Sequence, residues 1–211
     1  MFRFKALLLL LIFIPEENVW ELRKNQDNIL VYTRKVITSD FKEIKCLTRV
    51  HSTLSSIVKL LTDVDHYTDW IYNCNTATVV KKVNDAEIYS YQLFYVPWPA
   101  DNRDIVSVVK VTQDKKTKIV TVLSDIVHGM MPEKKGVVRV KKFHSSYLLI
   151  PKDSGYVDIN YEIGTDPGGI VPAWLVNMVI VKAPFNTQQM MNDLLQTPRY
   201  KTAKLNFIAE P

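Results

Sequence analysis

Most of the chain alternates apolar and polar residues with a period of two, which is typical of half-buried β-strands. Residues 29–37 and 42–50 are rich in β-branched side chains, and in the second range Ile44, Cys46, Thr48 and Val50 fall on one face. The same kind of pattern recurs at residues 76–83, 86–95, 104–112, 118–127, 137–150 and 155–163. Because the turns between these ranges are short, the pattern predicts antiparallel neighbours in a sheet with one apolar face.

Two segments have the period of a helix instead. After Ser52, a candidate N-cap, apolar residues follow at helical spacing from Leu54 to Leu61, and a second short helix is expected at 65–70. Apolar residues keep the same spacing from Trp174 to Leu195, where Pro184 is expected to kink or split the helix. This order of elements predicts an α+β fold in which a curved antiparallel sheet and a long C-terminal helix share one core.

The N-terminus has the layout of a secretory signal. Two positive charges in Met1–Lys5 precede an unbroken apolar run from Ala6 to Ile14, which is too short to span a bilayer. We therefore expect residues 1–16 to be a signal peptide or an N-terminal anchor, and residues 20–200 to form one domain. The protein would then be exported, to the periplasm or cell envelope of a bacterium; without a functional signal it would be cytoplasmic.

Composition narrows the function classes. A net charge of +5 on 211 residues is too small to indicate a surface that tracks nucleic acid, and 47% hydrophobic residues are typical of a globular domain. Export would allow Cys46 and Cys74 to form a disulfide, while two buried thiols are the more ordinary outcome. We expect a monomer that does not bind nucleic acid.

Motifs for catalysis are missing from the sequence. There is no G-x-S-x-G elbow, Gly-rich phosphate loop, C-x-x-C or H-E-x-x-H, and the four histidines have no metal-ligand spacing. Asp63, Asp65 and Asp69 lie close together without a calcium loop's pattern, so we interpret them as helix-end and turn residues. The prediction is a protein that is not an enzyme and holds no metal or cofactor.

Aromatic residues are more numerous than a sheet needs for stability. The set comprises Tyr89, Tyr91, Phe94, Tyr95, Trp98, Phe143, Tyr147, Tyr161 and Trp174. Tyrosines join an apolar ring to a hydroxyl and therefore suit an apolar cavity with a few hydrogen-bonding groups. Packing in an ordinary core is the alternative for each of them.

Three segments resemble a known family. PWPADNRD before a strand, MMPEKKGVVRV before a long strand, and DPGGIVPAWLVNMVI at the start of the C-terminal helix are similar to START domains, the steroidogenic-acute-regulatory-related lipid-transfer modules. The resemblance runs from about Trp20 to Thr197 and is that of a bacterial-type exported member. It implies a helix-grip fold, in which a curved antiparallel sheet wraps around a long C-terminal helix and encloses a hydrophobic tunnel for one lipid or sterol.

The resemblance also implies a set of site residues. We expect the tunnel to be lined by Tyr89, Tyr91, Tyr95, Trp98, Val109, Phe143, Tyr147, Tyr161, Trp174, Met178 and Val181. The loop 96–102 would lie at the tunnel mouth, with Trp98 as a lid residue near Trp174 or in contact with a membrane. Arg103 and Asp104 would hold the base of this loop, or else belong to a solvated turn.

One position departs from the family pattern. Sterol-binding members carry an arginine six residues after the equivalent of Arg103, paired with an acid, whereas this chain has Val109 there and neutral Ser90, Tyr91 and Gln92 on the preceding strand. Losing both charges together is consistent, because an unpaired buried charge is costly. We expect a ligand with a wholly apolar tail, or one whose hydroxyl is recognised by tyrosine.

The resulting hypothesis is non-enzymatic binding, and possibly transfer, of a lipid or sterol-like small molecule at a transient membrane contact. A basic run, Lys134, Lys135, Arg139, Lys141 and Lys142, would meet anionic lipid or form a plain solvated strand edge. The alternatives are a cyclase- or hydrolase-like enzyme using Asp125, His128 or Tyr161, and a ligand-dependent interaction or envelope-stress protein without transfer activity.

Overall fold

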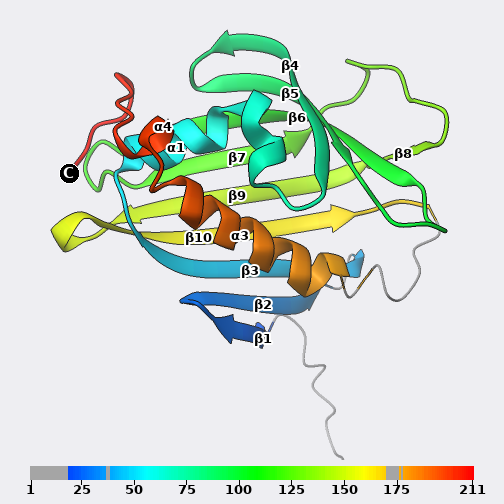
Figure 1. Cartoon of the computed structure of the whole chain (residues 1–211), viewed down its shortest axis with the longest axis horizontal. Coiled ribbons are helices and arrows are strands. Elements are labelled where there is room, and N and C mark those ends of the chain that lie inside the picture. Colours follow the sequence, from blue (N-terminus) through cyan, green and yellow to red (C-terminus); the bar gives the residue numbers. More distant parts are fainter. Residues whose placement is uncertain (1–18, 37–38, 170–175, 177) are drawn as a thin grey trace, which may run out of the picture.

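The computed structural model of the chain describes residues 19–36, 39–169, 176 and 178–211. These residues form a 10-stranded curved sheet, ordered β1-β2-β3-β10-β9-β7-β6-β5-β4, with β8 paired to β6 outside that path (Figure 1). The strands are β1 (Glu21–Gln26), β2 (Ile29–Val36), β3 (Ser39–His51), β4 (Cys74–Asn84), β5 (Glu87–Phe94), β6 (Asn102–Gln113), β7 (Val120–Ile126), β8 (Val137–Arg139), β9 (Lys142–Pro151) and β10 (Tyr156–Asp166).

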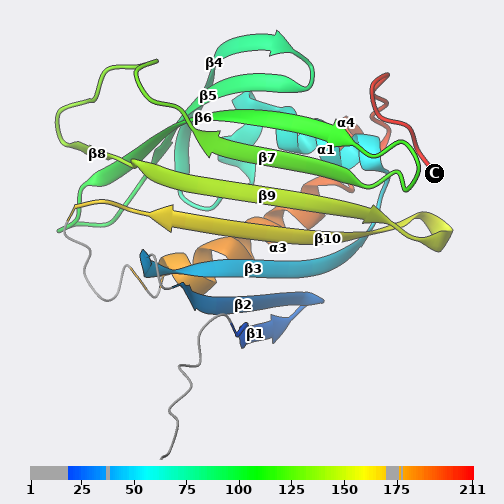
Figure 2. The same ribbon diagram turned by 180° about the vertical axis from the view of Figure 1, so that it is seen from behind.

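Helices cover one face of this sheet. They are α1 (Leu54–Thr62), the 3-10 helix η1 (Val64–Asp69), the π-helical turn η3 (Met178–Lys182), α3 (Ala183–Leu194) and α4 (Pro198–Lys201), whereas the 3-10 turn η2 (Asp153–Gly155) joins β9 to β10. Helix α3 lies across the sheet against β2 and β3, and the view from behind shows the sheet as a continuous layer in front of it (Figure 2). The α+β helix-grip fold predicted from the sequence is therefore confirmed.

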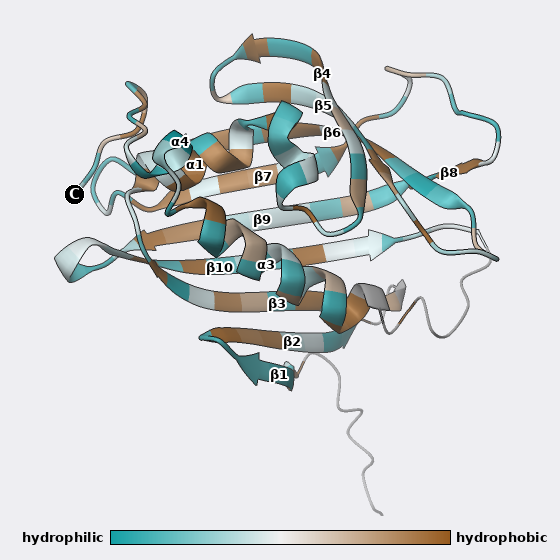
Figure 3. Ribbon diagram, viewed as in Figure 1, coloured by the Kyte–Doolittle hydropathy of each residue, from teal (hydrophilic) through white to brown (hydrophobic). Residues whose placement is uncertain are grey.

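The main core lies between the sheet and the helices. Leu54, Ile57 and Val58 of α1 are fully buried and Leu61 is 4% exposed, as their helical spacing predicts. Leu60, which does not belong to that spacing, is fully buried as well. Their partners include inward-facing residues of the strands such as Leu149 and Ile159. Figure 3 shows hydrophobic residues on α1 and on the strands that it covers.

Local chemistry moves several boundaries from their predicted places. Thr53, rather than Ser52, is the N-cap of α1, because its side-chain oxygen accepts the Ser56 backbone N–H at 3.1 Å. Pro184 does divide the C-terminal helix: the π-helical turn η3 ends at Lys182, and Pro184 then lies in the first turn of α3, where its missing N–H is tolerated.

The predicted strand 137–150 is two strands. β8 runs parallel to β6, with Asp104 opposite Arg139, and β9 starts again at Lys142 to pair with β7 and β10. The prediction of antiparallel pairs alone is therefore wrong at β8. Strand β1 was not predicted, because its residues ELRKNQ have no apolar alternation and lie almost entirely exposed at the sheet edge.

Both cysteines are buried free thiols, and burial raises the pKa of each, Cys46 and Cys74, to about 12. The predicted signal or anchor segment, residues 1–16, lies outside the described residues. Among the helices that the structure does describe, none has the length and hydrophobicity needed to cross a membrane.

Candidate functional site

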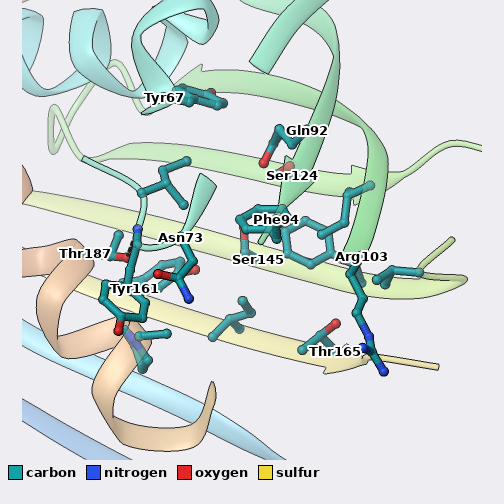
Figure 4. Close-up of a pocket in the computed structure, with 18 of the residues that line it drawn as sticks. Tyr67, Asn73, Gln92, Phe94, Arg103, Ser124, Ser145, Tyr161, Thr165 and Thr187 are labelled. Carbon is teal, nitrogen blue, oxygen red and sulfur yellow. Dashed lines mark hydrogen bonds between the residues drawn. The ribbon is translucent and has the colours of Figure 1, made fainter. Parts of the chain in front are cut away.

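A cavity of about 230 Å³ lies between the sheet, α1 with η1, and the beginning of α3. Its wall is mainly apolar, with side chains from both layers; examples are Ile44, Leu61, Ile71, Phe94, Val109, Val122, Phe143 and Ile163. Figure 4 shows the residues that line it, with strands of the sheet on one side and helical turns on the other. The curvature of the sheet thus leaves a hollow that the helix does not fill.

Five of the eleven residues predicted to bind ligand line this cavity: Tyr95, Val109, Phe143, Tyr147 and Tyr161. Val181 is half-buried and does not line it. Trp174 and the side chain of Met178 lie outside the described part of the chain. The sheet therefore supplies four of the five predicted residues that the structure brings together, and the loop after β5 supplies Tyr95.

Tyr89 and Tyr91 lie on the other face of the sheet. On β5 the residues that face the core are Ile88, Ser90, Gln92 and Phe94, so the odd-numbered tyrosines point away from the cavity. Tyr91 is nevertheless only 3% exposed, with the Lys134 ammonium 4.3 Å from its ring centre. Because both faces of this strand carry buried residues, alternation alone did not show which face the cavity uses.

Trp98 also lies away from the cavity wall. Its side chain is 89% exposed in the loop that joins β5 to β6, whereas Tyr95 at the start of the same loop lines the cavity and is 52% exposed. The loop is tied at both ends: the Tyr95 N–H donates to the Asn73 carbonyl at 2.9 Å, and the Val96 N–H donates to Asn102 Oδ1 at 3.0 Å. The loop thus presents a large aromatic ring to solvent from a fixed base.

Arg103 and Asp104 make contacts to segments beside this loop. The Arg103 guanidinium donates to the backbone carbonyls of Asp101 and, at 3.4 Å, Gly168, and in Figure 4 it points away from Gln92 and Ser124. Asp104 is fully buried and accepts two hydrogen bonds from Arg139, at 2.6 and 3.1 Å. Burial lowers the pKa of Arg103, although the guanidinium remains charged at any physiological pH.

Uncharged residues lie where the family resemblance implies an arginine paired with an acid in sterol-binding members. The Gln92 amide nitrogen donates to the hydroxyls of Ser90 (3.1 Å) and Ser107 (3.4 Å), which lie 3.2 Å from each other. Val109, on the strand next to Gln92, lines the cavity and is 4% exposed. This neutral cluster satisfies its own hydrogen bonds without a buried charge.

Two stacked tyrosines form another part of the wall. The rings of Tyr147 and Tyr161 lie 4.2 Å apart and nearly parallel, and Gln188 of α3 donates to the Tyr147 hydroxyl at 3.3 Å. Burial raises the pKa of both tyrosines well above the usual range, so both hydroxyls are neutral. They can donate and accept hydrogen bonds but cannot act as bases near neutral pH.

Several lining residues were not predicted, among them Tyr67, Trp70, Asn73, Gln92 and Thr187. Tyr67 and Trp70 come from the 3-10 helix η1 and the turn after it, where the rings pack edge to face with centroids 5.6 Å apart. A polar residue at an inward position of an otherwise apolar strand, as Gln92 is, was the signal in the sequence that could have found one of them.

The residues considered for catalysis are not brought together. Asp125 pairs with His144 at 2.6 Å, but both side chains are about half exposed, on the face of the sheet opposite the cavity. His128 does not line the cavity either, so Tyr161 is the one residue of these three candidates that does. Within the described residues no group of three or more His, Cys, Asp or Glu could hold a metal ion.

The predicted basic run is divided by the fold. Arg139 is 10% exposed in its ion pair with Asp104, and it also donates to the carbonyls of Met131 and Pro132. Lys134, Lys135, Lys141 and Lys142 remain exposed. Four of the five cations of the run are therefore exposed, one of them, Lys134, over the Tyr91 ring.

Comparisons with known proteins agree with this architecture. A sequence model of the START domain matches residues 13–201 of the chain. An uncharacterized protein of Pseudomonas aeruginosa is 33% identical over 171 residues, covering 80% of this chain and 82% of its own length. The mouse phosphatidylcholine transfer protein is 30% identical over 125 residues, covering 56% of this chain and 58% of its own length.

Solved structures show the same fold. A STAR-related lipid transfer protein from Xanthomonas axonopodis, crystallised as the fragment 25–204, superposes with a TM-score of 0.77 at 30% identity, covering 84% of this chain and 99% of the fragment. Human StAR-related lipid transfer protein 5 superposes with a TM-score of 0.68 at 17% identity, covering 84% of this chain and 88% of the other. The second likeness concerns the fold alone.

Proposed function

Since the chain belongs to the START domain family, we propose that its cavity binds one hydrophobic small molecule and that the protein carries this molecule between membranes without covalent chemistry. The observation that carries the proposal is the apolar hollow of about 230 Å³ between the sheet and the gripping helix. Relatives named for lipid transfer share the fold, and two of them are at least 30% identical to the chain.

Apolar burial supplies the driving force for binding. A ligand that leaves water for the cavity gains about 25 cal/mol for each Å² of apolar surface that it buries. Gln92 and its two serine partners form a neutral network in the wall, and the charged lining residue Arg103 donates to the backbone carbonyls of Asp101 and Gly168. A hydrophobic molecule can therefore enter and leave without breaking an ion pair.

Transfer needs a place where the protein meets the bilayer. We place that contact at the loop 95–101, because Trp98 is 89% exposed there while Tyr95, three residues earlier, lines the cavity. An indole ring suits the boundary between lipid headgroups and acyl chains. The exposed lysines of the predicted basic run would add attraction to anionic lipid, on the order of 1 kcal/mol each near such a surface. They are Lys134, Lys135, Lys141 and Lys142.

Export of the domain is part of the same proposal. The basic start and apolar run of Met1–Ile14 support it, and cell fractionation with an epitope at the C-terminus tests it. Recovery of the tagged chain in the cytoplasm alone would overturn export and leave the binding proposal intact.

A vesicle-to-vesicle assay tests the carrier function. Donor vesicles containing a fluorescent sterol, fatty acid or phospholipid are mixed with acceptor vesicles, with and without delipidated protein. We expect the protein to accelerate transfer of at least one of these lipids in proportion to its concentration. Binding without acceleration would favour a ligand-dependent interaction protein, and failure to bind any of them would overturn the proposal.

A further inference from the structure

Asn73 places a free amide in the cavity. Its backbone is left-handed, with φ of 58°, in the turn before β4, and its carbonyl accepts the Tyr95 N–H at 2.9 Å. Its side chain lines the cavity and makes no hydrogen bond with any residue that the structure describes. Asparagine tolerates this conformation better than other non-glycine residues, and the turn fixes the direction in which the amide points.

Two serine hydroxyls on the sheet are free in the same way. Ser124 of β7 and Ser145 of β9 lie directly opposite each other in the register, and both line the cavity. Neither hydroxyl has a hydrogen-bond partner within the described part of the chain, and Ser145 is only 5% exposed. Figure 4 shows Asn73 beside Thr187 and Tyr161 at one side of the cavity, with Ser124 and Gln92 at another.

Charge is absent from most of this wall. The described lining residues include no Asp, Glu, Lys or His, and Arg103 is their single cation. Its guanidinium donates to the backbone carbonyls of Asp101 and Gly168. An ionic head group in the apolar hollow away from Arg103 would lose its hydration without gaining a counter-ion, which is strongly unfavourable.

Size restricts the ligand further. A volume of about 230 Å³ lies at the small end for a binding site, since pockets for drug-sized ligands hold roughly 300–1,000 Å³. The hollow therefore fits one chain or one compact ring system better than two acyl chains.

We propose that the ligand is a hydrophobic molecule with a single chain or ring system and an uncharged hydroxyl or amide head group, and that the Asn73 amide binds this head group. An amide both donates and accepts, so it matches a group that does the same. The inference rests on the proposed binding function and specifies its ligand class. It makes Asn73 a specificity-determining residue of the cavity.

Calorimetric titration with four lipids in methyl-β-cyclodextrin tests the ligand class. The probes are palmitamide and 1-monopalmitoylglycerol, which are uncharged, palmitate at pH 8, which is anionic, and dipalmitoyl phosphatidylcholine, which is zwitterionic with two chains. We expect each uncharged probe to bind at least about tenfold more tightly than palmitate or the phospholipid. Palmitamide and palmitate have the same chain, so their ratio isolates the head group.

Asn73→Gly tests the residue itself, because glycine keeps the left-handed turn and removes only the amide. We expect this variant to bind palmitamide about tenfold more weakly, with little change for palmitate. Asn28→Gly is the matched control: Asn28 also has φ of 58°, in the turn between β1 and β2, and does not line the cavity.

Each result has a defined meaning. Equal or tighter binding of palmitate or the phospholipid would overturn the ligand class while leaving the carrier function in place. An unchanged palmitamide affinity in Asn73→Gly would overturn the role of Asn73. Binding of none of the four probes by the wild-type protein would overturn this inference, and failure to take up any vesicle lipid as well would overturn the proposed function.

Discussion

Asp104 and Arg139 form a buried ion pair, with 2.6 Å between Asp104 Oδ1 and Arg139 Nε and side chains that are 1% and 10% exposed. The pair joins β6 to β8, where the two residues lie opposite each other in a parallel register. Arg139 also donates to the carbonyls of Met131 and Pro132. One guanidinium therefore holds the segment before β8 against the strand that follows the Trp98 loop.

Replacing Asp104 with Asn would leave the Arg139 charge buried without its counter-ion. We expect the free energy of unfolding to fall by roughly 3 to 5 kcal/mol, the usual cost of breaking a buried pair from one side. Urea denaturation measures this loss. Asp158→Asn, which breaks the exposed pair with Arg49, is the control and should have a much smaller effect. Equal losses in the two variants would show that the Asp104 pair is not effectively buried.

Filling the cavity should abolish binding without unfolding the protein. Val109 is 4% exposed and lines the hollow, so Val109→Phe places a ring where the ligand would lie. We expect ligand affinity to fall at least about tenfold while the free energy of unfolding changes by less than about 1.5 kcal/mol. Val83→Phe, at a position that is 51% exposed on β4, should leave affinity unchanged. Unaltered binding by Val109→Phe would place the ligand elsewhere.

Trp98 should matter for transfer and not for stability. Removing its exposed ring in Trp98→Ala deletes roughly 1.5 to 3 kcal/mol of apolar membrane contact, so we expect vesicle-to-vesicle transfer to slow about tenfold. Phe207→Ala is the matched aromatic control, because Phe207 is 36% exposed in the C-terminal tail, and the C-terminus lies at the end of the molecule opposite β8 (Figure 1). Equal slowing by both variants would contradict a specific role for the Trp98 loop.

Acid should weaken the contact between α1 and α4 through Asp63. Burial alone would raise the pKa of Asp63, but hydrogen bonds from Arg199 and Tyr200 and the charges of Lys59 and Arg199 outweigh it and hold the pKa below its usual value. A lowered folded-state pKa means that this stabilisation is present above the unfolded pKa of about 3.9 and is lost as the pH falls through the folded value.

We therefore expect Asp63→Asn to be less stable than the wild-type protein at pH 7, with the difference shrinking as the pH falls below about 4. Urea midpoints measured for both proteins between pH 7 and pH 3 test this. A difference that stays constant or widens on acidification would show that the Asp63 carboxylate is not the group involved.

The C-terminal tail should stabilise α1 from a distance in sequence. Glu210 accepts the backbone N–H groups of Leu54 at 3.0 Å and Ser55 at 2.8 Å, and its negative charge lies at the positive end of the helix. We expect Glu210→Ala to lower the free energy of unfolding by about 1 kcal/mol. Thermal denaturation of the variant and the wild-type protein measures this loss. An unchanged midpoint would mean that water replaces the carboxylate without a loss of stability.

Alternation of apolar and polar residues predicted most of the strands, because each strand that packs on the helices needs one buried face. The family resemblance then implied the helix-grip arrangement of sheet and helix. The limits are also physical. Strand β1 is polar throughout and lies at an edge, so no pattern marks it. β8 is only three residues long, and its Arg139 pairs with Asp104, 35 positions earlier in the chain. The spacing of apolar residues along the sequence contains no information about such a long-range pairing.

The site was harder to predict than the fold. Tyr147 and Tyr161 lie opposite each other on β9 and β10, and both line the cavity. On β5 the aromatic face turned out to be the outer one, because residues beyond the sheet bury Tyr91 there while Gln92 and Phe94 face the cavity. Asn73 reaches the cavity through a left-handed turn, which a one-dimensional pattern does not reveal.

The central claim is that the hollow between the sheet and the gripping helix holds a guest. Native mass spectrometry of protein recovered from its own host tests this most directly. The account predicts one hydrophobic molecule for each chain, released on denaturation and missing from Val109→Phe. A bare chain in that spectrum, together with delipidated protein that takes up nothing from vesicles, would contradict it.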